Sequence, residues 1–484
     1  MQSCSERTSV ATKLAYGVGA LSDSIKTSGF SLFLLFYYTT VLGLPGTLLG
    51  FAMSVGLVWD AAIDPLIGHL SDHATFKFGR RHSFMLVGAV AAGASFMAVF
   101  NPPAGLSTAA LFAWLMVSSL CLRSSNSLFM VPYYALGAEL AADYHDRTSI
   151  AGFRSGAVLA GTMLATTAAF LVFLPTGSEE ALDPKFAPSS YASMGVAFGA
   201  VMMAVALVAT LGTLGERWRL GENSSPHSDG RLSLPRAMGL SLRDESFRVL
   251  VVSSGLSSMA MTVNAVLAMY FLTYHVRLAS SQLSTLYFVT FYAGSLIGVV
   301  VWVRVARHVQ KQYVYAAATM MAGAVMSAGY WLIGQGRPFG LGATWVLFAG
   351  SSLVGLFNSA AVVIAPSMMA DISAREELRS GRRHHGIHFG IYSFGQQISN
   401  GLAVLAAGVL ADRFARLVPG QAAQAPSTIE RLVVLSNVAP AVLLFAAGLI
   451  ILRYRVTRQD VQANQREPVM DLGREQVPEL EGSV

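Results

Sequence analysis

Two aspartates, Asp60 and Asp64, interrupt an otherwise apolar segment that runs from Leu57 to Gly68. Residues four apart lie on one face of a helix, about 6 Å from each other along its axis. An ionised carboxylate at the depth of lipid is costly unless a cation or another partner compensates it. The spacing predicts a site for a small cation, H+ or Na+, at this pair. The alternative is a polar network that only braces the helices.

The composition is that of a membrane protein. Of 484 residues, 54% are hydrophobic and 12% charged, against about 25% charged in an ordinary soluble domain. A helix needs about 20 apolar residues to cross a bilayer. The sequence predicts an all-α polytopic protein with twelve transmembrane helices, near residues 13–42, 46–71, 83–101, 108–137, 149–175, 191–215, 247–276, 281–303, 312–334, 341–370, 386–411 and 432–452.

Basic residues are distributed unequally between the connections. If both chain ends are cytoplasmic, Arg80, Arg81 and most other arginines fall in cytoplasmic connections. The positive-inside rule therefore places both termini in the cytoplasm, as expected for a multi-pass protein of a bacterial inner membrane. This bias accounts for the net charge of +6, so we expect no nucleic-acid partner.

The sequence gives no indication of catalysis. The two cysteines, Cys4 and Cys121, predict neither a disulfide framework nor a metal site. No phosphate-binding Gly-rich loop, zinc-protease motif or nucleophile elbow is found. We expect no enzyme activity, no cofactor and no bound metal other than a coupling Na+.

The chain divides into two halves. A polar segment rich in Ser, Gly and Arg separates an N-terminal six-helix bundle, 1–215, from a C-terminal one, 247–454. The connector is 216–246, and a hydrophilic tail, 455–484, is predicted to be disordered and cytoplasmic. A faint repeat relates the segment after Pro132 to the segment after Pro366. Such duplication is typical of six-plus-six transporters, whose substrate site lies between the halves.

Several segments resemble the glycoside–pentoside–hexuronide:cation symporters, the melibiose-permease-like branch of the major facilitator superfamily. They include the Trp-Asp-x-x-x-Asp-Pro element at 59–65, Val-Pro-Tyr-Tyr-Ala-Leu at 131–136, and Gly-Arg-Arg at 79–81 and 381–383. The resemblance implies the major facilitator fold and a cation site at Asp60 and Asp64. It also implies a sugar-site arginine at Arg154 and a cytoplasmic gate at Asp72, Arg80 and Arg81.

The chain departs from that family at two charged positions. Met130 stands where the family often has an acidic residue, and Gln397 stands where it often has a lysine. The resemblance therefore fixes neither the substrate nor the coupling ion.

The other candidates for the substrate site are polar residues within spans. They are Asp23, Arg123, Ser127, Tyr134, Arg154 and Gln397. Asp23 and Lys26 are three residues apart and could simply neutralise each other. Arg123 needs an anion when buried, either a helix aspartate or an acidic group of the substrate. Tyr134 could stack on a sugar or could only pack in the core.

Three functional classes follow from the sequence. The first is a cation-coupled symporter, H+ or Na+ dependent, for a sugar, glycoside, uronide or other small polar solute, acting as a monomer in the bilayer. The second is a carrier of a lysolipid or other amphiphile, or a drug exporter of the same superfamily. The third is a sensor that resembles a transporter but does not transport.

Overall fold

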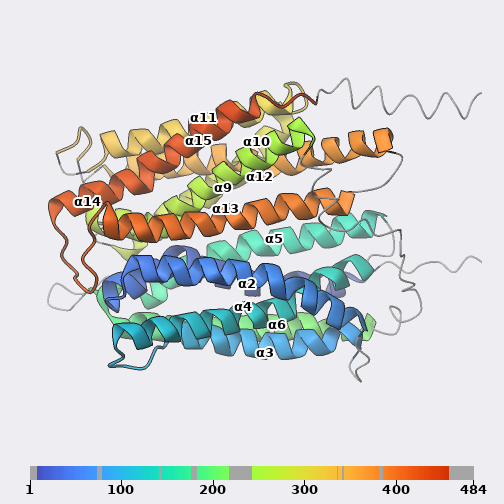
Figure 1. Cartoon of the computed structure of the whole chain (residues 1–484), viewed down its shortest axis with the longest axis horizontal. Helices are drawn as coiled ribbons and strands as arrows, with labels where there is room; N and C mark the ends of the chain where they lie inside the picture. The colour runs from blue at the N-terminus through green and yellow to red at the C-terminus, as the bar shows by residue number, and fades with distance from the viewer. Residues whose placement is uncertain are drawn as a thin grey trace, which may run out of the picture.

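The computed structural model describes residues 8–73, 79–140, 144–175, 183–216, 243–278, 280–334, 336–340, 343–380 and 385–456. These residues form helices and no strand, as Figure 1 shows. Residues 217–242 of the predicted connector and residues 457–484 of the predicted tail lie outside this part of the chain. The predicted disorder of the tail and the exact domain boundaries therefore stay predictions.

The first half contains six long helices. They are α1 (Val10–Ser28), α2 (Gly46–His73), α3 (Arg80–Phe100), α4 (Thr108–Glu139), α5 (Tyr144–Ala168) and α6 (Pro188–Gly212). The wider π-helical turns η1 (Gly29–Leu34) and η2 (Tyr37–Val41) continue α1, and η3 (Ala169–Phe173) continues α5. Short 3-10 turns are η4 (Pro184–Phe186) and η5 (Leu214–Glu216).

The second half repeats this arrangement. Its helices are α9 (Glu245–Tyr270), α10 (Ser281–Val305), α11 (Lys311–Leu332), α12 (Thr344–Ser380), α13 (His385–Arg413), α14 (Pro426–Val433) and α15 (Ala439–Ile451). The π-helical turn η6 (Phe271–His275) continues α9, and η7 (Val434–Val438) joins α14 to α15 as one segment.

Ten helices of the described chain are long and apolar enough to cross a membrane. The other two predicted spans are helical as well: α1 with η1 and η2, and α11, which has 22 residues. The first of these carries Asp23 and Lys26, which lower its hydropathy. Each of the twelve predicted spans thus corresponds to a helix, and the described residues form the all-α polytopic fold that the sequence predicts.

The helices pack into two bundles. In one bundle α3 packs against α4 and α6, α1 against α5 and α6, and α2 against α4. In the other, α12 packs against α10 and α11, while α9 packs against α13 and α15. Helices α2 and α13 lie side by side where the bundles meet (Figure 1).

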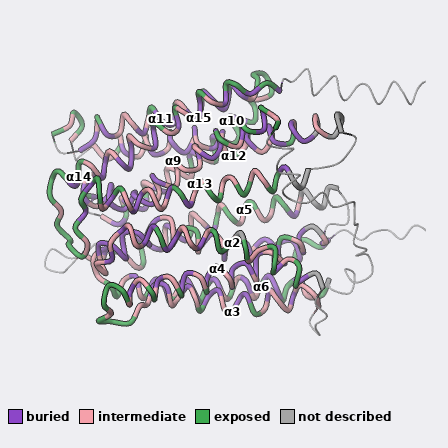
Figure 2. Tube along the Cα trace, viewed as in Figure 1, coloured by how far each residue is buried: buried purple, intermediate pink, exposed green. Residues whose placement is uncertain are grey.

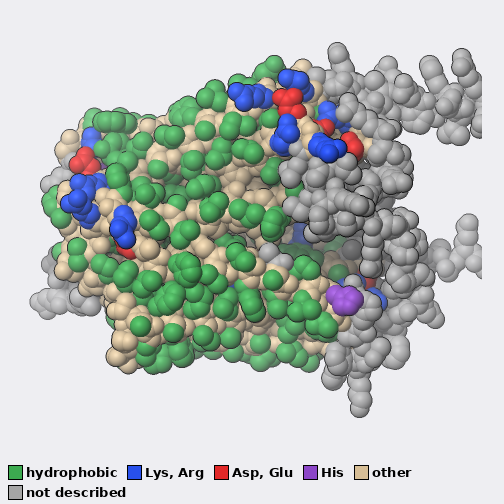
Figure 3. Space-filling view, viewed as in Figure 1, with side chains coloured by type: hydrophobic (Ala, Val, Ile, Leu, Met, Phe, Trp, Pro, Cys, Tyr) green, Lys and Arg blue, Asp and Glu red, His purple; other side chains and the backbone are tan. Residues whose placement is uncertain are grey.

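The outer surface is apolar along the length of the helices. Buried residues alternate with exposed ones in every bundle helix (Figure 2). In Figure 3 hydrophobic side chains cover the middle of the visible face, and charged side chains gather towards its two ends. Large apolar side chains such as Val117 and Leu449 are 62% and 60% exposed. An apolar belt between charged ends is the surface that a bilayer requires.

Contacts between the halves close one end of the molecule, the end at which α14 lies in Figure 1. The Asp412 carboxylate, at the end of α13, accepts hydrogen bonds from the backbone N–H groups of Gly46 (3.0 Å) and Thr47 (2.7 Å) at the start of α2. It also accepts one from the Thr47 hydroxyl, at 2.7 Å. A carboxylate at a helix N-terminus is favourable because the free N–H groups carry a partial positive charge.

Three more contacts reinforce this closed end. The Thr39 and Tyr270 hydroxyls share a hydrogen bond between the halves. The Gly420 N–H donates to the Thr39 carbonyl at 2.9 Å. The Lys185 ammonium, only 6% exposed, donates to the Leu278 carbonyl at 3.2 Å. Burial lowers the pKa of Lys185, and the nearby Asp183 carboxylate opposes that shift.

Asp412→Ala removes three hydrogen bonds between the halves, so we expect the closed end to open more often. Hydrogen bonds to a charged group contribute about 1.5–3 kcal/mol each. In a background without native cysteines, a Leu278→Cys probe should react several times faster with a membrane-impermeant maleimide once Asp412→Ala is added. An unchanged labelling rate would show that Asp412 does not hold this end closed.

Candidate functional site

The centre of the site is an ion pair between two helices of the first half. The Arg123 guanidinium on α4 donates a hydrogen bond from Nη1 to the Asp60 carboxylate on α2. The two side chains are only 15% and 20% exposed. The sequence left two kinds of partner for Arg123, a helix aspartate or an acidic group of the substrate. In the structure the partner is Asp60.

Gly56 makes room for this ion pair. A Cβ atom placed there would lie 2.2 Å from Nε and 2.7 Å from Cδ of Arg123. Gly56 precedes Asp60 by four residues, so it lies on the same face of α2. The guanidinium therefore packs directly against the α2 backbone, one turn before the carboxylate that it binds.

Asp64 lies one turn further along α2 and has no such partner. Its Oδ1 atom is buried without a hydrogen-bond partner among the described residues. The two aspartates predicted as a pair thus differ, since Asp60 has a guanidinium and Asp64 has an unfilled acceptor. A buried acceptor without a partner is unfavourable and can be satisfied by a proton or a small cation.

The hydroxyl of Ser124, next to Arg123 on α4, is already hydrogen-bonded. The Ser124 hydroxyl donates to the Leu120 carbonyl at 2.8 Å and accepts from Nε1 of Trp59 at 2.8 Å. Trp59 therefore ties α2 to α4 beside the ion pair. This bond gives Trp59 a structural role.

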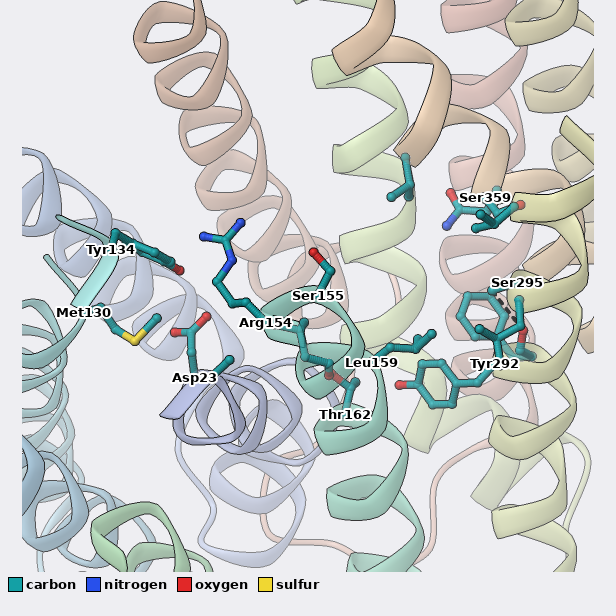
Figure 4. A pocket seen from close by; sticks show the side chains of 17 residues that line it. Asp23, Met130, Tyr134, Arg154, Ser155, Leu159, Thr162, Tyr292, Ser295 and Ser359 are labelled. Carbon is teal, nitrogen blue, oxygen red and sulfur yellow. Dashed lines mark hydrogen bonds between the residues drawn. The ribbon is translucent and has the colours of Figure 1, made fainter. Parts of the chain in front are cut away.

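A cavity of about 630 Å³ lies between the halves. Asp23, Met130, Tyr134 and Arg154 line it from α1, α4 and α5, and α10 and α12 provide the opposite wall. Figure 4 shows Asp23, Tyr134 and Arg154 gathered on one side, with Tyr292, Ser295 and Ser359 across the space. Three predicted substrate residues are thus brought to one cavity, although they are far apart in sequence.

The charges of this cavity are only partly compensated. Asp23 and Lys26 form an ion pair with 2.6 Å between Oδ1 and Nζ. This agrees with the interpretation that two residues three apart neutralise each other. Arg154 lies with Cζ 5.1 Å from the centre of the Tyr134 ring, a cation–π contact. No carboxylate within ion-pair distance of Arg154 is found in the described chain. Arg154 is therefore available to an electron-rich group of a solute.

The two other predicted substrate residues lie elsewhere. Gln397, on α13, lines a separate and mainly apolar pocket of about 250 Å³ between α2 and α13, with Leu57, Val58 and Phe394 among its walls. Ser127 is buried on α4 and lines neither cavity. Their substrate roles stay predictions.

The predicted gate has an additional member. Arg80 and Arg81 both bind the Glu139 carboxylate at the end of α4, at 3.3 and 2.5 Å. The side chain of Asp72, the predicted acidic member, lies outside the described residues. In the second half Lys311 binds Asp371 at 2.5 Å, which joins α11 to α12 in the same way. Glu139 and Asp371 lie at corresponding places in the faint sequence repeat. That correspondence was the signal that could have identified both as ion-pair partners.

The described part of the chain has no group of three or more His, Cys, Asp or Glu side chains that could hold a metal ion.

A polytopic helical fold in two bundles, with charged residues facing a cavity between them, defines a transporter of the major facilitator type. Residues 15–458 match the MFS/sugar transport protein family, and the chain belongs to that family. It is not an enzyme.

Two curated relatives match along nearly the whole chain. An uncharacterized symporter of Synechocystis is 25% identical over 95% of this chain and 98% of its own. A sphingosine-1-phosphate transporter of Mus musculus is 24% identical over 94% of this chain and 92% of its own. Among solved structures, a D-xylose–proton symporter superposes with a TM-score of 0.62 at 14% identity, covering 93% of this chain and 98% of its own. That likeness concerns the fold.

Gly56→Ala tests the packing of the ion pair. The new methyl group cannot coexist with Arg123 in its present position, so we expect a loss of about 1–3 kcal/mol of stability, typical of overpacking. Gly152→Ala on α5 is the matched control, because a Cβ there would meet nothing within 4 Å. Thermal unfolding in detergent should show a lower Tm for Gly56→Ala only. Equal melting temperatures would contradict the close contact.

Proposed function

We propose that this protein is a secondary active symporter that moves a small polar solute together with a cation, H+ or Na+, by alternating access. The class of solute is a sugar, glycoside, uronide or similar organic anion. The observation that supports this proposal best is the buried Oδ1 of Asp64, which has no hydrogen-bond partner among the described residues and lies beside an aspartate that already has its counter-charge.

The coupling follows from charge. With Asp60 bound to Arg123 and Asp23 bound to Lys26, Asp64 and Arg154 have no ion-pair partner among the residues that the structure describes. A cation that binds Asp64 removes the cost of its buried negative charge. If the solute binds well only in that state, the gradient of the cation drives the solute, and by linkage the solute also strengthens cation binding.

The solute would bind between the two walls of the cavity. Arg154 and Tyr134 present a guanidinium and an aromatic ring, which suit the hydroxyl or carboxylate groups and the apolar face of a sugar. Ser295, Ser359 and Asn358 offer hydrogen-bonding groups from the other half. A solute that touches both walls can favour closure of the halves around it.

The direction of opening follows from the closed end. The contacts of Asp412, Thr39 and Lys185 block the end of the molecule at which α14 lies. An even number of spans places both termini at the opposite end, which the positive-inside rule assigns to the cytoplasm. On this proposal the structure is an inward-facing state of a monomer in a bacterial inner membrane.

A second function is supported by one feature of the cavity. Val158 of α5, Leu296 and Val299 of α10, and Val362 of α12 line it while remaining 37–65% exposed. An amphiphile could place its head near Arg154 and its chain among these residues. The likeness to a sphingosine-1-phosphate transporter fits this alternative.

A stability screen distinguishes the two functions. The purified protein is heated with neutral glycosides, uronides, other organic anions and lysolipids, one at a time. A ligand at 100 times its dissociation constant should stabilise the fold by about 2.7 kcal/mol. Stabilisation by a sugar or uronide supports the symporter, and stabilisation by amphiphiles alone contradicts it.

Asp64→Asn should separate binding from coupling. The amide fills the same volume but carries no negative charge, so it cannot hold the coupling cation. With the solute found in the screen, we expect proteoliposomes to lose uptake against a concentration gradient by at least tenfold while exchange of internal for external solute continues. Arg154→Gln, by contrast, should weaken exchange itself. Full accumulation by Asp64→Asn would exclude Asp64 as the coupling group.

A further inference from the structure

We propose that the Arg123 guanidinium occupies the place of an alkali cation at the α2 carboxylate pair, Asp60 and Asp64. This protein therefore does not bind or respond to Na+ or Li+. The inference deepens the proposed function, on which it rests, because it narrows the identity of the coupling ion. It is carried by the ion pair with Asp60, by the space that Gly56 leaves for the guanidinium, and by the absence of a second ion-pair partner for Arg123 in the described chain.

An alkali cation shared by Asp60 and Asp64 would need oxygen atoms from both carboxylates. Hard cations in proteins are held by several oxygen ligands, and carboxylates supply the charge. Here the Asp60 carboxylate is engaged by the Arg123 guanidinium. The Ser124 hydroxyl, next to Arg123, is also occupied, by Trp59 and by the Leu120 carbonyl. Arg123 binds Oδ2 of Asp60, so a metal cation would find beside Asp64 a carboxylate whose charge is already balanced.

Electrostatic repulsion also disfavours a metal cation at this pair. A cation between the two aspartates would lie close to a guanidinium that cannot lose its proton. Two like charges about 4 Å apart near a protein surface repel strongly enough to weaken binding about a thousandfold. Lys26, although paired with Asp23, is a further positive charge close enough to act on Asp60. Lys26 on α1 and Arg123 on α4 thus both present positive charge to this aspartate.

The guanidinium cannot easily move aside. It is 15% exposed and lies against the backbone of α2, where a Cβ atom at position 56 would be 2.2 Å from its Nε. Leaving Asp60 would expose a buried arginine without a counter-charge, which is costly. The pair is therefore a fixed part of the site and not a salt bridge that Na+ can displace.

The experiment measures Na+ binding without a solute. The melting temperature of the purified protein is followed in NaCl against choline chloride at equal ionic strength, up to about 0.15 M. For the wild-type protein we expect no difference between the two salts. Arg123→Gln should gain a saturable stabilisation by Na+, with an apparent dissociation constant about a thousandfold lower than in wild type, and Asp60→Asn should abolish that gain.

Two further variants serve as controls. Arg123→Lys keeps a positive charge and should stay insensitive to Na+. Arg154→Gln removes the guanidinium that lines the cavity and should also stay insensitive. If Arg123→Gln cannot be purified, equilibrium binding of radioactive Na+ to the wild-type protein decides the question, because the proposal requires no more binding than in Asp60→Asn/Asp64→Asn.

Saturable stabilisation or binding of Na+ by the wild-type protein, lost in Asp60→Asn, would overturn the proposal. So would an Arg123→Gln protein that folds and ignores Na+. Because the measurement uses no solute, it is independent of whether the protein transports one. Failure of solute uptake in proteoliposomes under a pH gradient and a Na+ gradient would contradict the proposed function and leave this inference standing.

Discussion

The buried ion pair between Asp60 and Arg123 is the constraint on which the rest of this structure depends. A carboxylate or a guanidinium alone within a membrane span is expensive, and together they are tolerated because each supplies the charge that the other needs. The pair fixes the rotation of α2 against α4, requires glycine at position 56, and leaves the Asp64 carboxylate with an acceptor that no described residue fills. The same ion pair thus determines how α2 packs against α4 and which aspartate is proposed to bind the coupling cation.

Other charged side chains are also held by partners, at the two ends of the molecule. Towards the end that bears the termini, Arg80 and Arg81 with Glu139, and Lys311 with Asp371, join corresponding helices within each half. At the other end Asp412 and the Thr39–Tyr270 pair join one half to the other. Strong contacts within each half and separable contacts between halves are what rigid-body rocking requires.

Much of this could be predicted from sequence because its physical signals are local. Apolar length alone indicates ten of the spans, and the spacing of Asp60 and Asp64 placed both on one face of α2. The partner of Arg123 could not be chosen, since Asp23, Asp60 and Asp64 were all chemically suitable and the choice depends on how α4 lies against α2. The role of Gly56 and the Asp412 contact were missed for the same reason, because both arise from packing between helices distant in sequence.

A double-mutant cycle on the unfolding free energy in detergent tests the central claim most directly. Asp60→Asn and Arg123→Gln should each destabilise the protein by about 3–5 kcal/mol, because each leaves a buried charge without its partner. The double variant, which leaves no lone charge, should be no less stable than either single one, so that the two effects are far from additive. Additive losses would show that the two side chains do not depend on each other.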